Sequence, residues 1–469
     1  MRVEQLYTGC LAQGAYYIES DGEVAVIDPL RETSPYLERA TRDNAAIKYV
    51  FETHFHADFV SGHLTLSKKT GAPIVFGPNA NPNFEATIAT DGQVFPLGKA
   101  QIVVLHTPGH TMESTTYLLR DEQGKDHAIF TGDTLFLGDV GRPDLAQKAT
   151  HLTQEQLAAT LFESLREKIM PLADDVIVYP AHGAGSACGK NMMKETIDTL
   201  GNQKQVNYAL RSTMTKEEFI KEVTDGLLPP PQYFPLNVKM NKEGYADLDE
   251  VVAQGTQALS PAAFEIAANE TGALVLDVRH QNDFVKGHIP RSIFIGLDGG
   301  FAPWVGTLIA DVKQPLLLVV SEGRETEAVT RLSRVGFDNP LGYLKGGFDA
   351  WRNAQKECDS IQSVAATDLK KVIENDTAIV FDVRKETEYN ASHIPTGTNT
   401  PLRLINEHLA SFPTKGNFYM HCAGGYRSVI AASILKSRGI HNLIDISGGF
   451  SAIEAAGIPV SPHVCPSTL

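Results

Sequence analysis

Histidine and aspartate residues recur at the ends of apolar segments in the first half of the chain. The densest group is the segment 53–59 (THFHADF), and His110, Asp133 and His182 each end a further apolar segment. A single histidine in such a place is more often structural than a metal ligand. Several strand ends in one domain, however, can bring imidazole and carboxylate groups to one edge of a sheet. The sequence therefore predicts a metal site built from histidine and aspartate.

The elements that must position these groups are short segments rich in β-branched residues, which we expect to be buried strands. A helix is predicted after Thr153, because Thr153 and Gln156 form a capping-box pattern and an apolar stripe of Leu157, Leu161, Leu165 and Ile169 follows. Strands that alternate with helices indicate an α/β fold. The predicted strands cover residues 24–30, 48–54, 73–77, 102–110, 128–133 and 176–182.

Composition narrows the classes of function. The formal net charge of −15 argues against a nucleic-acid partner, because phosphate binding requires a basic face. No apolar run approaches the ~20 residues of a membrane span, and the start of the sequence lacks the apolar core of a signal peptide. The five cysteines are odd in number and far apart in the sequence. This pattern is typical of a reducing compartment, so we expect a cytoplasmic protein.

The separated motifs in residues 1 to about 230 resemble the metallo-β-lactamase superfamily. In that superfamily an HxHxDH motif, a distal histidine, a bridging aspartate and a last histidine build two metal sites. Phe59 stands at the position of the final HxHxDH histidine and cannot bind a metal. We therefore expect a single metal. The resemblance implies an αββα sandwich for residues 1–235.

Within the superfamily, the single-metal pattern is similar to the persulfide dioxygenase branch, which uses one iron. The resemblance implies that His54, His110 and Asp133 hold one Fe(II) per chain. Two imidazoles and one carboxylate leave open positions, as in other Fe(II) enzymes that activate oxygen. The implied substrates are O2 and a low-molecular-weight persulfide, such as glutathione persulfide or a bacterial equivalent. The implied products are sulfite and the free thiol.

The remaining polar residues of the motifs are predicted to support these ligands. His56, Asp58 and His182 are candidates to orient the ligands through hydrogen bonds, and His182 can also meet the substrate. Cys188 lies six residues after His182, and Lys190 nearby would favour its thiolate. We expect Cys188 to contact substrate sulfur, although a lone cysteine is more often a small buried apolar residue.

Arg142 lies in a Gly-Arg-Pro-Asp stretch similar to one in the same family. Its guanidinium can pair with a substrate carboxylate in a bidentate manner. It can equally form an internal salt bridge with Asp144 or Asp139. The sequence leaves both interpretations open.

An internal repeat of about 100 residues occupies the second half of the chain. Three tripeptides recur in the same order at nearly constant spacing, which predicts two copies of one α/β domain. A triple-proline segment at 229–231 precedes them, and together with the residues up to about 256 it looks like a semi-rigid linker. The repeats are Asp-Val-Arg at 277–279 and 382–384, His-Ile-Pro at 288–290 and 393–395, and Gly-Gly-Phe at 346–348 and 448–450. The predicted linker covers 236–256, and the two copies cover 257–357 and 358–469.

Cys422 directly follows a predicted strand in the second copy and precedes a predicted helix from 429. Two glycines in the loop allow backbone N–H groups to turn toward one point, and the helix N-terminus adds positive potential. Both features stabilise an anionic sulfur, and the short loop leaves that sulfur little side-chain cover. The sulfur-binding loop is predicted to consist of Cys422, Ala423, Gly424, Gly425, Tyr426, Arg427 and Ser428.

This loop and the two upstream motifs resemble the rhodanese family, which implies that Cys422 carries sulfane sulfur and that Arg427 assists it. Four residues separate Cys422 from Arg427, one fewer than in cysteine phosphatases, so a phosphatase is disfavoured. In the first copy, Val320 and Glu325 stand opposite Cys422 and Arg427. No cysteine occurs between 188 and 358, so this copy is predicted to be inactive.

Together these features predict a persulfide dioxygenase joined to a sulfurtransferase. Cys422 can take sulfur from thiosulfate or pass it to sulfite to give thiosulfate, and the sequence does not set the direction. One alternative is a glyoxalase II-like thioesterase with two metals and an accessory sulfurtransferase. A second alternative is that the rhodanese-like copies only bind persulfides. Homo-oligomer formation is left open.

Overall fold

Two six-stranded sheets face each other in the first part of the chain, which in this computed structural model is a unit of residues Met1–Glu250 and Leu332–Gly336. The structure describes residues 1–147, 151–375 and 378–464. The first sheet has the order β1-β2-β3-β4-β5-β6, and the second has the order β12-β11-β10-β9-β8-β7. The strands are β1 Arg2–Thr8, β2 Gln13–Ser20, β3 Glu23–Ile27, β4 Ala46–Glu52, β5 Ile74–Phe76, β6 Thr87–Ile88, β7 Val94–Leu97, β8 Ala100–His106, β9 Thr115–Arg120, β10 Asp126–Gly132, β11 Ile177–Pro180 and β12 Asp198–Thr199.

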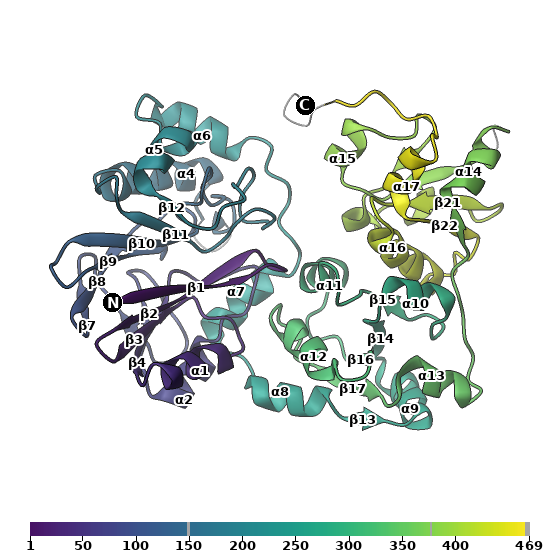
Figure 1. Cartoon of the computed structure of the whole chain (residues 1–469), viewed down its shortest axis with the longest axis horizontal. Coiled ribbons are helices and arrows are strands. Elements are labelled where there is room, and N and C mark those ends of the chain that lie inside the picture. Colours follow the sequence, from purple (N-terminus) through teal and green to yellow (C-terminus); the bar gives the residue numbers. More distant parts are fainter. Residues whose placement is uncertain (148–150, 376–377, 465–469) are drawn as a thin grey trace. The chain divides into compact units, whose positions relative to one another are not determined.

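Helices cover the outer face of each sheet (Figure 1). An apolar layer fills the space between the sheets, with Ile18 of β2 and Phe130 of β10 among its buried members. The opposite face of the first sheet packs on α1 and α2, and that of the second packs on α4, α5 and α6. The predicted αββα sandwich is therefore confirmed. The helices are α1 Ser34–Arg42, α2 His63–Thr70, α4 Gln154–Ser164, α5 Leu200–Val206, α6 Lys216–Thr224, α7 Phe234–Glu243 and α8 Leu248–Gly255.

Helix α4 begins where the sequence predicts. The Thr153 hydroxyl accepts the Gln156 backbone N–H, and the Gln156 side chain accepts the Thr153 N–H in return. The four apolar residues of the predicted stripe are all buried. Residues four apart drift about 40° around an α-helix. A π-helical turn at Leu165–Ile169 takes up this drift and keeps the stripe on the core.

The segment 236–256, predicted as a linker, is helical for most of its length. Pro235 lies in the first turn of α7, where a proline is tolerated, so it does not prevent the helix. Asn241 of α7 is buried and donates to the backbone carbonyls of His56 and Phe59. Helix α7 is thus part of the first unit and braces the histidine motif.

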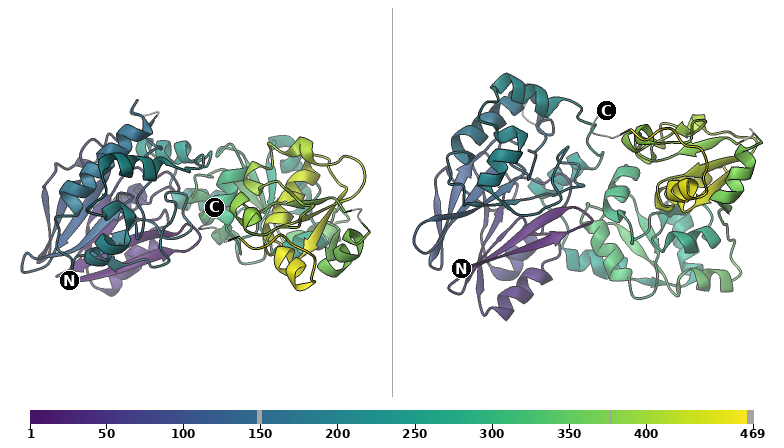
Figure 2. Two further views of the ribbon diagram at one scale, coloured as in Figure 1. Left: turned by 90° about the horizontal axis from the view of Figure 1, so that it is seen from above. Right: turned by 45° about the horizontal axis from the view of Figure 1, so that its top comes forward.

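The second unit, Val251–Arg331 and Phe337–Leu469, contains two parallel sheets of five strands each. Their strand orders are β13-β17-β16-β14-β15 and β18-β22-β21-β19-β20. These orders are identical when the strands of each copy are numbered from its own first strand. Helices lie on both faces of each sheet (Figure 1; Figure 2). The predicted duplication is confirmed. Its strands are β13 Ala258–Leu259, β14 Leu274–Asp277, β15 Ile293–Phe294, β16 Leu316–Val319, β17 Pro340–Leu344, β18 Ser363–Ala365, β19 Val380–Asp382, β20 Thr398–Asn399, β21 Phe418–His421 and β22 Leu443–Ser447. Its helices are α9 Pro261–Thr271, α10 Gln281–Lys286, α11 Phe301–Leu308, α12 Glu325–Ser333, α13 Gly347–Asn353, α14 Ala366–Ile373, α15 Glu386–Ala391, α16 Tyr426–Ser437 and α17 Gly449–Ala455.

The two copies pack against each other through α16 of the second copy and β15 of the first. The Phe294 N–H donates to the Ser433 hydroxyl, which is buried. The Tyr426 hydroxyl donates to the Gly296 carbonyl at 2.8 Å. The two copies therefore form one unit rather than two independent domains.

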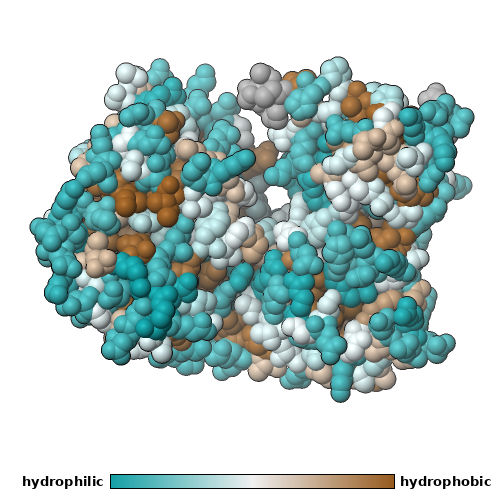
Figure 3. Space-filling view, viewed as in Figure 1, coloured by the Kyte–Doolittle hydropathy of each residue, from teal (hydrophilic) through white to brown (hydrophobic). Residues whose placement is uncertain are grey.

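The face of the molecule seen in Figure 3 is mainly hydrophilic, and its apolar residues form small separate groups. This surface agrees with the net charge of −15. No helix among the described residues has the length and apolar character that a membrane crossing requires.

Candidate functional site

Three strand ends bring the predicted ligands together at one edge of the sandwich. His54 follows β4, His110 follows β8 and Asp133 follows β10, and all three residues are buried. One ligand atom from each lies within 4.8 Å of the others. The Oδ2 atom of Asp133 is 3.4 Å from His110 Nε2 and 3.9 Å from His54 Nε2. Both imidazoles thus face the same carboxylate oxygen.

Hydrogen bonds on the far side of each ring fix which nitrogen faces the centre. His110 Nδ1 donates to the Arg142 backbone carbonyl at 2.8 Å. The Thr53 hydroxyl donates to Asp28, so it accepts the proton of His54 Nδ1 at 3.0 Å. Each ring therefore carries a proton on Nδ1 and turns its Nε2 atom toward Asp133. This arrangement is the one that metal-binding histidines adopt.

The electrostatic environment agrees with a metal centre. Burial lowers the pKa of His54 well below its usual value, and the neighbouring His56 and His110 act in the same direction. His54 is therefore neutral, which is the form that binds metals. Neither carboxylate oxygen of Asp133 has a hydrogen-bond partner among the described residues. Because a buried carboxylate without a partner is costly, the residues fit a divalent cation that would bind Asp133 and both Nε2 atoms.

A second group of three residues lies beside the first. His56, Asp58 and His182 are buried and offer ligand atoms within 4.8 Å of one another. His182 Nε2 is 3.4 Å from Asp58 Oδ1 and 3.5 Å from Asp133 Oδ1, so the two oxygens of Asp133 face the two groups. Burial alone would lower the pKa of His182, but the Asp58 and Asp133 carboxylates raise it well above its usual value.

His56 is also engaged from the opposite side, which the sequence did not predict. Its Nε2 atom is 3.1 Å from Asp28 Oδ1 and 3.5 Å from Glu52 Oε2. Burial, together with the nearby Asp28, raises the pKa of Glu52 well above its usual value. The Phe59 ring lies 4.3 Å from the His56 ring between centroids and is fully buried. Phe59 therefore forms an apolar wall beside His56. The sequence contained a sign of both residues, because Asp28 directly follows one apolar strand and Glu52 ends the next.

Cys188 lies at the same edge of the sandwich. Its sulfur is within 4.8 Å of ligand atoms of Asp133 and His182. The expected support from Lys190 is absent, because Lys190 Nζ donates to the carbonyls of Glu222 and Asp225. Burial, followed by the negative charge of Asp133, instead raises the pKa of Cys188 to about 12. Lys190 therefore does not promote a Cys188 thiolate.

Arg142 forms an internal salt bridge, one of the two roles that the sequence left open. Its guanidinium makes bidentate contacts of 2.6 and 2.7 Å with Asp144 and also donates to the carbonyls of Ala187 and Leu228. The side chain is 5% exposed. Since its donors are engaged, Arg142 has no free fork for a substrate carboxylate. Its backbone carbonyl orients His110.

In the second copy, Cys422 stands at the end of β21 and directly before the loop that leads into α16. The Gly425 N–H donates to Cys422 Sγ at 3.1 Å, as expected for a loop that stabilises an anionic sulfur. The prediction of an uncovered sulfur was wrong, because Cys422 is 1% exposed. The turn at Gly448–Gly449 covers it, with the Phe450 N–H donating to the Cys422 carbonyl at 2.7 Å.

The other loop residues occupy distinct places. Arg427 pairs with Glu388 through contacts of 2.6 and 2.8 Å, so Glu388 sets the orientation of its guanidinium. Ser428 is buried and donates to the Gly425 carbonyl, whereas Gly424 is exposed at the tip of the loop and Ala423 is partly buried. The sequence did not identify Glu388, because its partner is 39 residues away.

Comparison with known proteins assigns both parts of the chain. Residues 8–182 match the Metallo-beta-lactamase superfamily, and residues 260–354 and 365–456 match the Rhodanese-like domain. Human persulfide dioxygenase ETHE1, a mitochondrial protein, is 30% identical over 221 residues, which are 47% of this chain and 78% of that protein. A cytoplasmic hydroxyacylglutathione hydrolase of Arabidopsis thaliana is 30% identical over 178 residues, 37% of this chain and 65% of that protein. A crystal structure of a metallo-beta-lactamase from Staphylococcus aureus subsp. aureus COL is 30% identical with a TM-score of 0.64, covering 73% of this chain and 98% of that one.

The fold and the histidine–aspartate centre define a metallo-β-lactamase-type protein that carries two rhodanese-like domains. The chain belongs to the family of the persulfide dioxygenase ETHE1 within the metallo-β-lactamase superfamily.

A buried carboxylate beneath the Cys422 loop leads to a prediction about stability. Asp445 of β22 accepts the Ser363 hydroxyl with one oxygen, and its other oxygen has no partner among the described residues. Burial raises the pKa of Asp445 from 3.8 to about 6. Between these pH values the folded protein holds a proton that the unfolded chain has released. The stability therefore falls as the pH rises through this window, by about 3 kcal/mol in total.

An Asp445→Asn variant is expected to be more stable than the wild type above pH 6, by up to about 3 kcal/mol, and equally stable near pH 4. Calorimetric unfolding of both proteins across this pH range measures the difference. Asp368→Asn, which alters an exposed carboxylate of the same copy, serves as the control. Parallel pH profiles for Asp445→Asn and the wild type would contradict the prediction.

Proposed function

We propose that the first unit oxidises a low-molecular-weight persulfide with O2 and that Cys422 of the second unit carries sulfane sulfur. The balanced reaction converts R–S–SH, O2 and water into R–SH, sulfite and two protons. The observation that carries the proposal is the centre itself. Two imidazoles, each with its Nδ1 proton engaged elsewhere, face a buried Asp133 carboxylate that has no hydrogen-bond partner among the described residues.

One Fe(II), held by His54, His110 and Asp133, would supply the redox chemistry and open positions for the reactants. The chain's own residues then have separate tasks. Thr53 and the Arg142 carbonyl hold the imidazole rings in place. Phe59 excludes water from one side of the site, because its ring is fully buried against His56.

Cys188 and one residue of the second group, His182, face the substrate in this proposal. Cys188 and His182 lie within reach of the Asp133 carboxylate, so they line the space next to the ligands. The charge on His182 would favour an anionic persulfide there. Cys188 would contact the substrate sulfur.

At Cys422 the sulfur transfer is an exchange. The thiol of Cys422 takes the outer sulfur of a persulfide and releases the free thiol, leaving a cysteine persulfide. Sulfite then takes that sulfur as thiosulfate and regenerates the thiol. The Gly425 N–H, which donates to Sγ, would stabilise the negative charge during both steps. The described cysteines are unpaired, which agrees with the cytoplasmic location that we propose.

The test is oxygen consumption by the iron-loaded full-length protein with glutathione persulfide, with iron, sulfite and thiosulfate quantified in parallel. One iron per chain and oxygen uptake matched by sulfite formation are expected. Absence of oxygen uptake would refute the proposal. In the same assay, unchanged oxygen uptake by Cys188→Ser would remove Cys188 from the substrate site.

A second candidate function is a metal-dependent thioesterase. The group of His56, Asp58 and His182 favours it, because it offers a second set of metal ligands beside the first. The hydroxyacylglutathione hydrolase relative agrees with this alternative. Two metals per chain, together with hydrolysis of lactoylglutathione and no oxygen uptake, would establish the thioesterase instead.

A further inference from the structure

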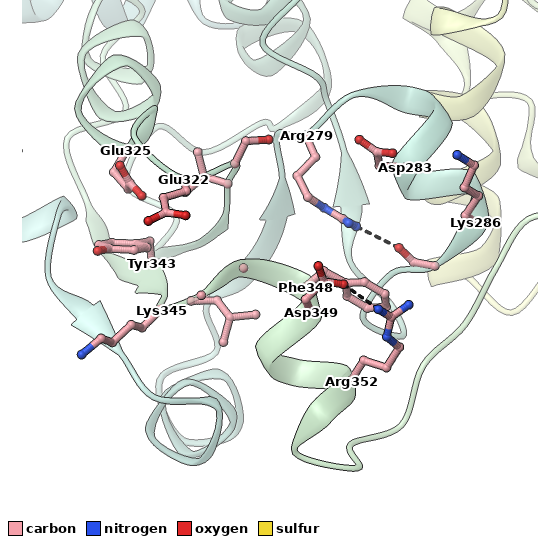
Figure 4. Close-up of a pocket in the computed structure, with 16 residues that line it drawn as sticks. Arg279, Asp283, Lys286, Glu322, Glu325, Tyr343, Lys345, Phe348, Asp349 and Arg352 are labelled. Carbon is pink, nitrogen blue, oxygen red and sulfur yellow. Dashed lines mark hydrogen bonds and ion pairs between the residues drawn. The ribbon is translucent and has the colours of Figure 1, made fainter.

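The cysteine-less copy contains a cavity at the place where the other copy holds Cys422. The cavity has a volume of about 700 Å³ and lies at the carboxyl ends of β14, β16 and β17 (Figure 4). Ligands of parallel α/β sheets bind at this edge. The residues that form it include Arg279, Lys286, Val320, Glu322, Glu325 and Phe348.

The loop around this cavity keeps the shape of the sulfur-binding loop but not its chemistry. Gly323 has a φ of +83° and its counterpart Gly425 has a φ of +100°, so both loops make the same left-handed turn. In the second copy the Gly425 N–H donates to Cys422 Sγ. In the first copy the Gly323 N–H donates to the Glu325 carboxylate at 3.2 Å. In the first copy the Glu325 carboxylate thus accepts the N–H group whose counterpart in the second copy donates to sulfur.

The nucleophile itself is replaced by Val320, which cannot form a covalent bond with a ligand. The first copy is also more acidic at this site than the second copy. Arg427 pairs with Glu388 in the second copy, whereas the corresponding residues here are Glu325 and Asp283, both acidic. The cavity therefore repels a sulfur anion at its acidic wall and holds its ligand without a covalent bond.

The free charges of the cavity are separated in space. Glu322 and Glu325 lie together near Tyr343 on one side, and Lys286 lies on the opposite side, beyond Arg279 and Asp283 (Figure 4). No ion pair is recorded in the described part of the chain for either Glu322 or Lys286.

The other cations of the cavity are already engaged or turned outward. Arg279 is bound to Asp277 and the Gly287 carbonyl, and Arg352 is bound to Asp349. Lys345 extends away from the two glutamates in Figure 4. Asp283 also lines the cavity, three residues before Lys286 on α10, and leaves that end with charges of both signs. A ligand that carries an ammonium group at one end and a carboxylate at the other complements the two glutamates and Lys286.

We propose that the cavity of the cysteine-less copy is a non-covalent binding site for a zwitterionic thiol of the amino-acid or peptide type. Its ammonium group would lie against Glu322 and Glu325, and its carboxylate would lie against Lys286. The zwitterionic character follows from the two glutamates on one side of the cavity and Lys286 on the other. The assignment of a thiol rests on the proposed function, in which such a carrier is the substrate and the product.

The two tryptophans of the chain offer a selective test, because Trp304 and Trp351 both belong to this copy. Trp351 lies on α13 and shares an apolar cluster with Phe348, which lines the cavity. In a full-length Trp304→Phe protein, the tryptophan emission reports on Trp351 alone. We would titrate this protein with S-methylglutathione, which cannot exchange sulfur at Cys422.

A saturable change in the emission is expected. The change should need about tenfold more ligand in a Glu322→Gln/Glu325→Gln variant, as for the loss of about 1.4 kcal/mol of binding energy. S-methylglutathione with an acetylated amino group should bind equally weakly to both proteins. A Glu270→Gln/Glu357→Gln variant, which removes two exposed acidic charges of the same copy outside the cavity, is the matched control.

Calorimetric titration of the same variants covers the case in which Trp351 does not respond. Identical affinity in the wild type and in Glu322→Gln/Glu325→Gln, or no binding to the wild type by either method, would overturn the proposal. The titration needs no turnover, so its outcome is separate from the oxygen assay. Failure of the proposed function would appear as absent oxygen uptake, whatever the titration shows.

Discussion

A His110→Ala variant is expected to lose its iron and to lose oxygen uptake by more than about 100-fold. Removal of residues that only support a metal ligand already costs about 10–100-fold in many metal sites, and we propose His110 as a direct ligand. The loss should be large because His110 Nε2 is one of only two imidazole nitrogens that face Asp133 Oδ2. Metal analysis and oxygen consumption measure the two effects.

His106→Ala provides a matched control for this result. His106 ends the same strand, β8, but its ring is directed to the Met112 carbonyl and takes no part in the centre. This control is expected to keep iron and oxygen uptake near the wild-type values. Retention of one iron and of oxygen uptake by His110→Ala would show that the metal is bound elsewhere.

The positions of the ligands could be predicted from the sequence because they depend on simple rules. A buried strand must end in a polar residue when it reaches the edge of a sheet, and strand ends of neighbouring strands meet there. His54 and Asp133 follow this rule directly. The duplication could also be predicted from the sequence, because three tripeptides recur in the same order. The two copies accordingly share one strand order.

Features that depend on long-range contacts could not be predicted in this way. Asn241 donates to the His56 carbonyl from 185 residues away. This contact cannot be seen in the local sequence, and the segment around α7 was therefore predicted to be a linker. Arg142 pairs with Asp144, but its further donors go to Ala187 and Leu228, and only the fold shows that the fork of its guanidinium is already occupied. Local spacing cannot decide between a substrate and an internal partner when both are carboxylates or carbonyls.

The burial of Cys422 also depends on long-range contacts. The Gly448–Gly449 turn, which is remote in sequence, packs so closely on the Cys422 backbone that a Cβ added at 449 would lie 2.5 Å from the Cys422 carbonyl oxygen. The sequence of the loop alone, with its two glycines, suggested an open sulfur.

A Cys422→Ser variant is expected to form sulfite from glutathione persulfide but no thiosulfate. The serine hydroxyl fits the place of the thiol and can accept the Gly425 N–H, so the loop should keep its shape, yet it cannot hold sulfane sulfur. Quantifying sulfite and thiosulfate over time separates the two sites. Cys358→Ser, at an exposed free cysteine, is the control and should form both products like the wild type. Undiminished thiosulfate formation by Cys422→Ser would mean that sulfite meets sulfane sulfur without this loop. Loss of both products would instead mean that the persulfide must pass through Cys422 before it is oxidised, which would set the direction of sulfur flow from the second unit to the first.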